Sequence, residues 1–496
     1  MSITEAEREV KRAMEAVFLC SKIQQESVPR LADIEAKLWT SLLSLGRAVL
    51  VLFLTRCAAV PRASSYTYEG QPYVLDRSTR RSSQLGSRFG KIPFSRPVGI
   101  PLGGSSRAAD LPVDRDLGLC SGFSLGTVMA VTRLCAMMAF ATANSVFRQF
   151  HEWGPSPRAL LRMVDAVGGE ARPFLEQAPA PADDGEILVI EADGGGAPMI
   201  STAEYQRRCQ PKRKRADTQR HHRRLRRREH PKARRTKGQK SKNSKLAVVG
   251  AVYTLKRTVQ GLEGPINKRL IATFTSHAEL FRWLELEATK RGYGKKRTLF
   301  LADGSEHIWE LAHKHFAKAE VGLDWIHVAE KLWSAGQCVH PEGSAELCAW
   351  VAKQQALLRR GWVDSMLQNL IAAFMGIPKT GPGNKGRRER LGNVIDYLTG
   401  HRERLRYHEL RRDDLPIATG VIEGAIRNLV RVRLDGPGMR WSRDRAESVL
   451  HLRCILLNNQ WDDFSRHIAT RSLRLCAQPI PTRTHDAKPQ SLPVAA

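Results

Sequence analysis

Three acidic residues, far apart in the sequence, could together carry out chemistry on phosphates. Asp193 lies in "EADG", Asp303 in "LADGSE" and Glu423 in "GVIEGA". Cleavage of a phosphodiester needs an activated water or hydroxyl and a stabilised leaving oxygen, and two divalent ions about 3.5–4 Å apart supply both. Clustered carboxylates hold such ions, and Mg²⁺ keeps some of its waters, so two or three acids suffice. Asp193, Asp303 and Glu423 are therefore candidate catalytic ligands of two Mg²⁺ or Mn²⁺ ions.

Each acid also has an ordinary structural explanation. Asp303, with Glu306 three residues later, could cap a helix. Asp193 precedes a glycine, a common turn pattern, and Glu423 could be a first-turn acid that the helix dipole favours. A capping box does not explain Glu423, because Thr419 stands four residues before it instead of three. One such acid says little, so the surrounding elements must decide.

The elements around these acids alternate between apolar strands and amphipathic helices. We predict strands at 186–194, 245–255, 268–276, 297–304 and near 321, and helices at 277–291, 306–317 and up to 333. This order, closed by a helical insertion and a final helix, predicts an α/β ribonuclease-H-like catalytic core. Its first and fourth strands are neighbours, so Asp193 and Asp303 at their ends can meet. The small neighbours of Glu423 would let its helix start approach the strands.

The charge of the chain points to a polyanionic partner. Lys and Arg number 79 against 50 acids, a net charge of +29. The segment 207–245 alone holds 19 Lys and Arg and two acids, a net charge of +17. We expect it to contact DNA phosphates, although such a run could also be a solvated, disordered segment. The residues predicted to bind DNA there are Arg213, Lys214, Arg215, Arg223, Arg224, Arg226 and Arg227.

Composition also divides the chain into regions. We predict an N-terminal helical segment (1–60), an irregular Gly/Pro/Ser/Arg-rich region (61–115), a helical region (116–176), the first part of the core (184–335) with a basic loop (205–245), a helical insertion (336–405), closing helices (406–470) and a disordered tail (471–496). The 116–176 region could be a helix-turn-helix DNA-binding unit or a plain helical hairpin. The N-terminal part is thus expected to be a mainly helical DNA-binding region.

The cysteines and the N-terminal residues indicate the compartment. Nine cysteines form no CxxC pair, which argues against a zinc ribbon or a disulfide framework and fits a reducing cytoplasm. The apolar run 38–54 approaches the length of a membrane span but contains Ser41, Ser44 and Arg47. We therefore expect a buried helix, no signal peptide, and a cytoplasmic, nucleoid-associated protein without a membrane partner.

Several stretches resemble the insertion-sequence DDE transposases of bacteria, in the ISKra-type group of the Mutator-like branch. The likeness is carried by "LPVDRDLGL", "EADG", "LADGSEHIWEL", "LDWIHVAEKLW", "TGVIEGAIRNLV" and "GPGMRWSRDRAESVLHLRCILLNNQWDDF". It spans roughly residues 110–465, and the C-terminal block is its most specific part. Where the family often has Gly-Ser-Gly before the final acid, this chain has "IATG", with small residues Ala418 and Thr419.

The resemblance implies roles for particular residues. It implies that Asp193, Asp303 and Glu423 are the catalytic triad. It also implies that Asp324 and His327, spaced D-x-x-H, support the site, although both could be purely structural. In "GMRW", Arg440 and Trp441 could contact or stack on DNA, or Trp441 could pack in the core.

The expected function is that of a DDE transposase. It would bind the ends of its element in double-stranded DNA, cleave them by metal-dependent hydrolysis, and transfer the 3′-hydroxyl to target DNA without a covalent enzyme intermediate. Pairing of two ends implies a homodimer or larger assembly on DNA. Two alternatives are a ribonuclease-H-like nuclease without strand transfer and a non-catalytic nucleic-acid-binding protein.

Overall fold

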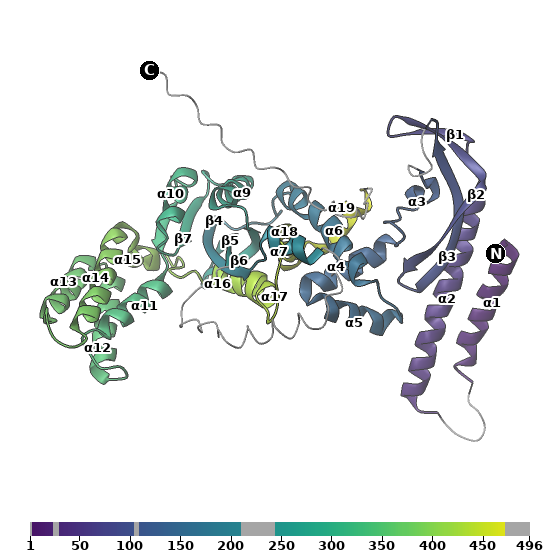
Figure 1. Cartoon of the computed structure of the whole chain (residues 1–496). Coiled ribbons are helices and arrows are strands. Elements are labelled where there is room, and N and C mark those ends of the chain that lie inside the picture. The colour runs from purple at the N-terminus through teal and green to yellow at the C-terminus, as the bar shows by residue number, and fades with distance from the viewer. Residues whose placement is uncertain (1, 23–28, 104–108, 210–243, 472–496) are drawn as a thin grey trace, which may run out of the picture. The chain divides into compact units, whose positions relative to one another are not determined.

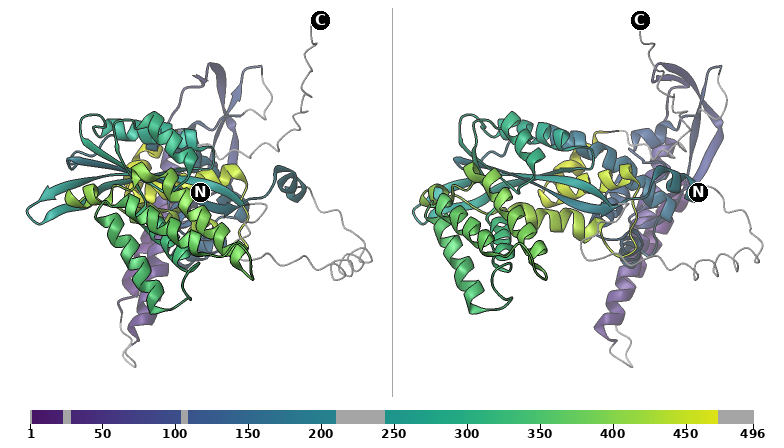
Figure 2. Two further views of the ribbon diagram at one scale, coloured as in Figure 1. Left: turned by 90° about the vertical axis from the view of Figure 1, so that its left-hand side faces the viewer. Right: turned by 60° about the vertical axis from the view of Figure 1, so that its left-hand side comes forward.

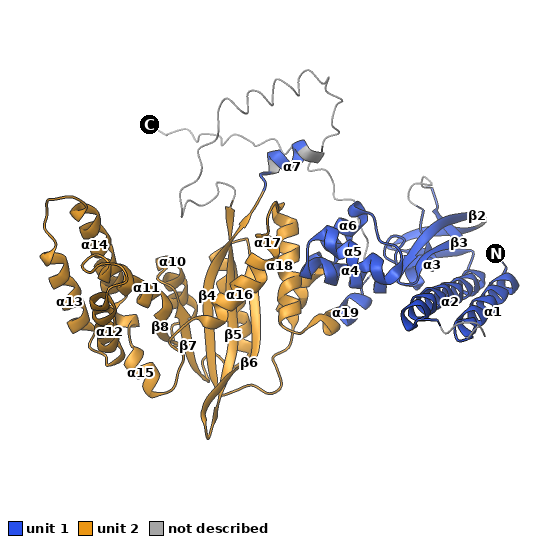
Figure 3. Ribbon diagram, turned by 90° about the horizontal axis from the view of Figure 1, so that it is seen from below, with its two compact units in different colours: residues 1–169, 200–243, 465–496 blue, residues 170–199, 244–464 orange. Residues whose placement is uncertain are grey.

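The computed structural model describes residues 2–22, 29–103, 109–209 and 244–471 (Figure 1). The chain divides into two compact units, coloured separately in Figure 3. Unit 1 contains residues 1–169, 200–243 and 465–496, and unit 2 contains residues 170–199 and 244–464. The predicted DNA-binding residues of the basic loop and nearly all of the predicted tail lie outside the described residues.

Unit 1 combines helices with a sheet, where the sequence indicated only short strand-like pieces such as "YTYEGQPYVL" in an otherwise irregular region. Helices α1 (Ile3–Leu19) and α2 (Leu31–Ala59) are followed by an antiparallel sheet of β1 (Ser65–Tyr68), β2 (Gln71–Ser87) and β3 (Gly90–Pro101). The prediction of an irregular region at 61–115 is therefore wrong. Strand β3 tolerates prolines because it is an edge strand, where a missing N–H costs little.

Helix α2 differs from the buried helix that its composition suggested. Only Leu43 and Leu54 of this helix are buried, while Trp39, Leu42, Phe53 and others are exposed. By length and hydropathy α2 could cross a membrane, but signal sequences and the core helices of soluble proteins meet the same criterion. It is the one such helix among the described residues.

Four helices follow the sheet. They are α3 (Pro112–Asp116), α4 (Leu125–Met137), α5 (Phe140–His151) and α6 (Pro157–Gln177). Ser124 caps α4 by accepting a hydrogen bond from the N–H of Thr127. Glu152 ends α5 in the left-handed conformation. The helical character predicted for 116–176 is thus present.

Unit 2 is built on a mixed five-stranded sheet. Its strands are β4 (Ile187–Pro198), β5 (Ser244–Thr258), β6 (Gly261–Thr273), β7 (Arg297–Ala302) and β8 (Glu320–Leu323). They lie in the order β6-β5-β4-β7-β8, with β4, β7 and β8 parallel and β5 antiparallel to both β4 and β6. The prediction that the first and fourth strands are neighbours is confirmed. Helix α7 (Thr202–Cys209) follows β4.

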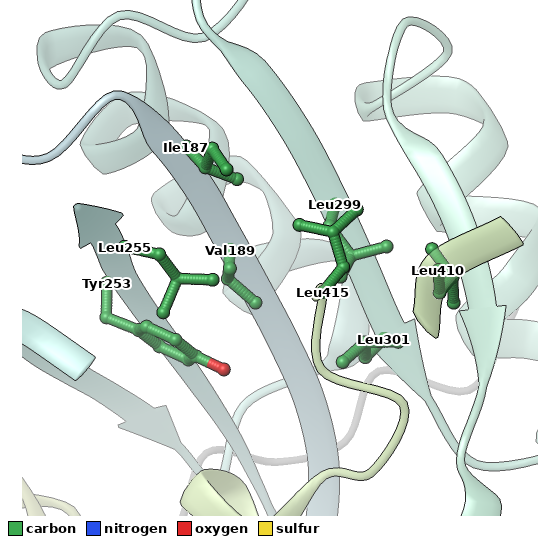
Figure 4. Packing of buried hydrophobic residues seen from close by; sticks show 8 residues of the cluster. All are labelled: Ile187, Val189, Tyr253, Leu255, Leu299, Leu301, Leu410 and Leu415. Carbon is green, nitrogen blue, oxygen red and sulfur yellow. The ribbon is translucent and has the colours of Figure 1, made fainter. Parts of the chain in front are cut away.

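Helices cover both faces of this sheet. On one face α9 (His277–Lys290) and α10 (Glu306–His315) pack aromatic side chains against β7, where Phe300 contacts Phe281 and Trp309. On the other face Val189, Leu299 and Leu301 pack with Leu410 and Leu415 from the segment that precedes the last acid (Figure 4). Alternation along β4 puts every second residue from Ile187 onward on this second face.

The remaining helices belong to the insertion and the closing part. They are α11 (Trp325–Gly336), α12 (Ala345–Arg359), α13 (Val363–Gly376), α14 (Asn384–Gly400), η2 (Arg402–Arg404), α15 (Tyr407–Arg412), α16 (Gly420–Ile426), the π-helical turn η3 (Arg427–Arg431), α17 (Val432–Leu434), α18 (Arg443–Leu457) and α19 (Trp461–Ala469). Figure 3 shows α12, α13 and α14 grouped beyond β8, the edge strand of the sheet, and Figure 2 shows the same helices in green from two further sides. The insertion predicted at 336–405 is therefore helical, as expected.

Candidate active site

The register of the two central parallel strands brings two of the predicted acids together. Ala192 of β4 is paired with Ala302 of β7. The next residues are Asp193, inside β4, and Asp303, just after β7 ends. The expectation that Asp193 ends its strand is wrong, because β4 continues to Pro198. The parallel register still places these two aspartates side by side where β7 ends.

Asp303 does not cap the helix that follows it. Its Oδ1 accepts a hydrogen bond from the N–H of Ser305 at 3.0 Å, and its backbone oxygen accepts one from the Trp309 indole at 2.7 Å. Helix α10 begins only at Glu306, with Ser305 as its N-cap. The alternative of a capping aspartate therefore fails, because this bond belongs to the turn between β7 and α10.

Glu423 lies in a helix whose first turn is held by acids from other elements. Thr419, the residue before α16, makes no side-chain cap. Its own N–H donates to Oδ1 of Asp324 at 2.8 Å. The N–H of Ile422 donates to Oε2 of Glu191 on β4, also at 2.8 Å. Two unpaired donors of the helix start are thus satisfied by buried carboxylates.

Asp324 and His327 form a pair at the start of α11. Asp324 is fully buried, and its Oδ2 accepts from the His327 N–H at 3.0 Å and contacts the imidazole Nδ1 at 2.6 Å. This bond is the main cause that raises the pKa of His327 to about 9. At neutral pH the imidazole is therefore a cation, which carries positive charge into a site rich in acids.

The charges in this region are coupled. Burial raises the pKa of Asp193, and the charges of Asp303 and Glu423 add to that effect. The N–H of Gly194 and the charge of His327 act in the opposite direction. Like charges that lie near a buried carboxyl group disfavour its charged form, and a bound cation would relieve that cost for Asp193.

One set of three side chains in this region could hold a metal ion. One ligand atom each from Asp324, His327 and Glu423 lie within 4.8 Å of one another, the one such set among the described residues. Asp193 is not part of it, nor is Asp303. Opposite charges explain why Glu423 lies with the His327 cation. Asp324 already accepts bonds from Thr419 and His327, so it serves better to orient His327 than to bind an ion.

The close approach of α16 to the strands occurs at a residue other than those expected. A Cβ added to Gly420 or Gly424 would meet nothing within 4 Å. Of the small neighbours of Glu423, Gly420 and Gly424 are therefore not what permits the approach. A Cβ on Gly195 of β4 would lie 2.8 Å from Cγ2 of Ile426 and 3.4 Å from Val430. The strand, not the helix, supplies the small residue.

The insertion reaches the site through a tyrosine. The Tyr397 ring of α14 packs against Gly304, next to Asp303, where a Cβ would collide with it. Burial, together with the nearby negative charges, raises the pKa of Tyr397 to about 12, so its hydroxyl stays protonated. Lys331 of α11 lies over the same ring at 4.8 Å from its centroid. The position of Tyr397 could not be predicted from the sequence, because it stands 93 residues after Gly304, its neighbour in space.

The two residues of the "GMRW" motif behave differently. Trp441 is 5% exposed, its indole donates to the Leu434 backbone oxygen at 2.8 Å, and the Arg433 guanidinium lies over its ring. Its ring belongs to the core, so the predicted stacking on DNA is wrong in this structure. Arg440 is exposed and keeps its predicted availability for phosphate.

Sequence reasoning overlooked other residues near the site. Glu191 was read as part of a buried strand, although its spacing of two from Asp193 puts both on one face. Arg427 and Arg431 are exposed and follow Glu423 at intervals of four, a spacing that could have flagged them.

Comparison with known proteins adds no assignment. No protein-family model matches the sequence, and no curated protein matches it.

Proposed function

We propose that this protein is a DDE transposase with a ribonuclease-H-like core, in which Asp193, Asp303 and Glu423 hold divalent cations at the end of the central strands. The observation that carries the proposal is that the charges of Asp303, just after β7, and of Glu423, on a distant helix, both act on Asp193 of the neighbouring strand β4. The sheet order, with the first strand between the second and the fourth, is the order expected of such a core.

The donor chemistry of the site suits Mg²⁺ or Mn²⁺. Carboxylate oxygens are the ligands that these hard cations prefer. Asp193 and Asp303 would hold the cations, and Glu423 would complete the site. When bound, two such ions supply an activated water or hydroxyl and stabilise the leaving oxygen. His327, a cation through Asp324, would orient Glu423 and attract the phosphate.

Exposed basic residues next to Glu423 support DNA as the substrate. Arg427 and Arg431 are the first and last residues of η3, which follows α16, and Arg440 is exposed a little further on. Contacts of this kind with phosphates would be largely independent of base sequence and weakened by salt. The high net charge of the chain agrees with a DNA partner.

The test is a cleavage and strand-transfer assay on DNA of the element ends with Mg²⁺ or Mn²⁺. We expect wild type to cut and join, and Glu423→Gln to bind DNA but to lose about 10²–10³-fold in rate, the equivalent of ~3–4 kcal/mol. Glu346→Gln is the matched control, because Glu346 is an exposed first-turn acid of α12.

Each other result has a definite meaning. Equal losses in the two variants would mean that Glu423 acts only through the helix dipole, and the triad would be wrong. Metal-dependent cutting without joining would favour a nuclease. Binding without cutting by wild type would favour a nucleic-acid-binding protein.

A further inference from the structure

A buried carboxylate on the central strand is not used as a ligand by the proposed chemistry. Glu191 is completely buried, two residues before Asp193 and on the same face of β4. Both of its oxygens are occupied. Oε1 accepts from the Tyr253 hydroxyl and Oε2 from the Ile422 N–H, each at 2.8 Å. Burying a carboxyl group is costly unless it is fully hydrogen-bonded, and this one is.

The hydrogen bond from the Ile422 N–H to Glu191 connects Asp193 to Glu423 through a short path. Ile422 immediately precedes Glu423, so the path runs from Asp193 along two residues of strand, across one hydrogen bond, and through one peptide unit. Tyr253, from the neighbouring strand β5, fixes the other oxygen and thus the direction of the carboxylate. Glu191 therefore determines how far the start of α16 stands from the end of β4.

We infer that Glu191 is a positioning residue that sets the distance between Glu423 and Asp193 for cation binding. This inference rests on the proposed function. Residues that orient metal ligands typically change metal affinity 10–100-fold when they are mutated. What matters in this role is the reach of the side chain to the Ile422 N–H, and its charge matters little.

Two conservative substitutions separate reach from charge. Glu191→Gln keeps the length and an acceptor oxygen but removes the charge. Glu191→Asp keeps the charge but is one methylene shorter and loses the Ile422 N–H. A purely electrostatic role would weaken cation binding in Glu191→Gln, whereas a positioning role would weaken it in Glu191→Asp. The two roles thus predict opposite results.

The experiment is a titration of the full chain with Mn²⁺ alone, followed by electron paramagnetic resonance. We expect Glu191→Asp to bind Mn²⁺ about 10–100-fold more weakly than wild type, and Glu191→Gln to bind it like wild type. The matched control is Glu287→Asp, the same shortening of a buried acid on α9 whose charged partner is Arg269. It should lose thermal stability without losing affinity for Mn²⁺.

The outcomes distinguish this inference from the proposed function. Wild-type affinity in Glu191→Asp, or a loss in Glu191→Gln alone, would overturn the positioning role while the metal site stands. Equal losses in Glu191→Asp and Glu287→Asp would show a general effect of destabilisation and would also overturn it. Equal affinity in wild type and Glu423→Gln would overturn the metal site itself, and the inference with it.

Discussion

Replacing Gly195 by alanine should push the helix that carries Glu423 away from the sheet. The added methyl group would lie 2.8 Å from Cγ2 of Ile426 and 3.4 Å from Val430. Carbon atoms pack best at about 3.5–4.0 Å, so Ile426 must retreat by roughly 1 Å. Overpacking of this kind costs about 1–3 kcal/mol of unfolding free energy.

The same displacement should reduce activity. Ile426 is three residues after Glu423 in the same short helix. A misplacement of about 1 Å can lower a catalytic rate ~10²-fold. We therefore expect Gly195→Ala to lose far more cleavage activity than its stability loss accounts for at a temperature where the chain is folded. Chemical denaturation and the cleavage assay measure the two effects separately.

A second substitution tests the cause. Ile426→Ala removes the methyl group that collides. By itself it should lower the free energy of unfolding by about 2–5 kcal/mol. In the double variant the new alanine has room, so the combined loss should be smaller than the sum by about 1–3 kcal/mol. Gly424→Ala is the control, since its Cβ meets nothing, and should stabilise the helix by about 0.5–1 kcal/mol. Additive losses, or a Gly195→Ala as stable as wild type, would refute the argument.

Three further predictions concern charge and burial. Burial alone would raise the pKa of Asp184, but bonds from Arg291 hold it below its usual value. The stability from this pair is present above about pH 4 and lost as pH falls further, and Asp184→Asn should flatten that acid limb in urea unfolding. In the metal-free chain Asp324→Asn should move the pKa of His327 from about 9 toward 6.5, as followed by NMR of the imidazole ring. In wild type the bond between Asp324 and His327 contributes its full stabilisation below pH 6.5, and this contribution is lost as the pH rises through about 9. Trp441→Phe should cost about 1–3 kcal/mol by leaving a buried carbonyl unpaired, and an unchanged DNA affinity in a filter-binding assay would agree with its place in the core.

The strands of unit 2 could be predicted because their sequences are short apolar runs, which are typical of buried strands. "EILVIEADG" and "RTLFLADG" are apolar runs that end in an acid and a glycine, and they became β4 and β7. The long strands β2 and β3 were missed because they are rich in Arg, Ser and Pro. In β3 buried and exposed residues alternate, with Ile92, Phe94 and a buried Arg96 on one face. The salt bridge from Arg96 to Asp114 makes that alternation acceptable, and sequence alone does not show it.

The candidate site was predictable in its acids but not in what holds them. The proximity of Asp193 and Asp303 follows from strand order, since each comes directly after the apolar run of one of two neighbouring parallel strands. The supports of Glu423 come from Glu191 and Asp324, 232 and 99 residues earlier in the chain. Every residue except proline has a backbone N–H, so the residue type does not indicate which N–H donates to a distant carboxylate. For this reason the partners of Ile422 and Thr419 could not be predicted from the sequence.

The distance along the chain between the acids also has a consequence in time. Residues 187–323 contain all five strands of the unit 2 sheet, whereas Glu423 is made 120 residues after Asp303. At about 5–20 residues per second, a ribosome needs roughly 6–24 s to cover that interval. During this time the growing polypeptide contains Asp193 and Asp303 but not yet Glu423. A reaction that needs all three acids cannot begin before residue 423 has been made.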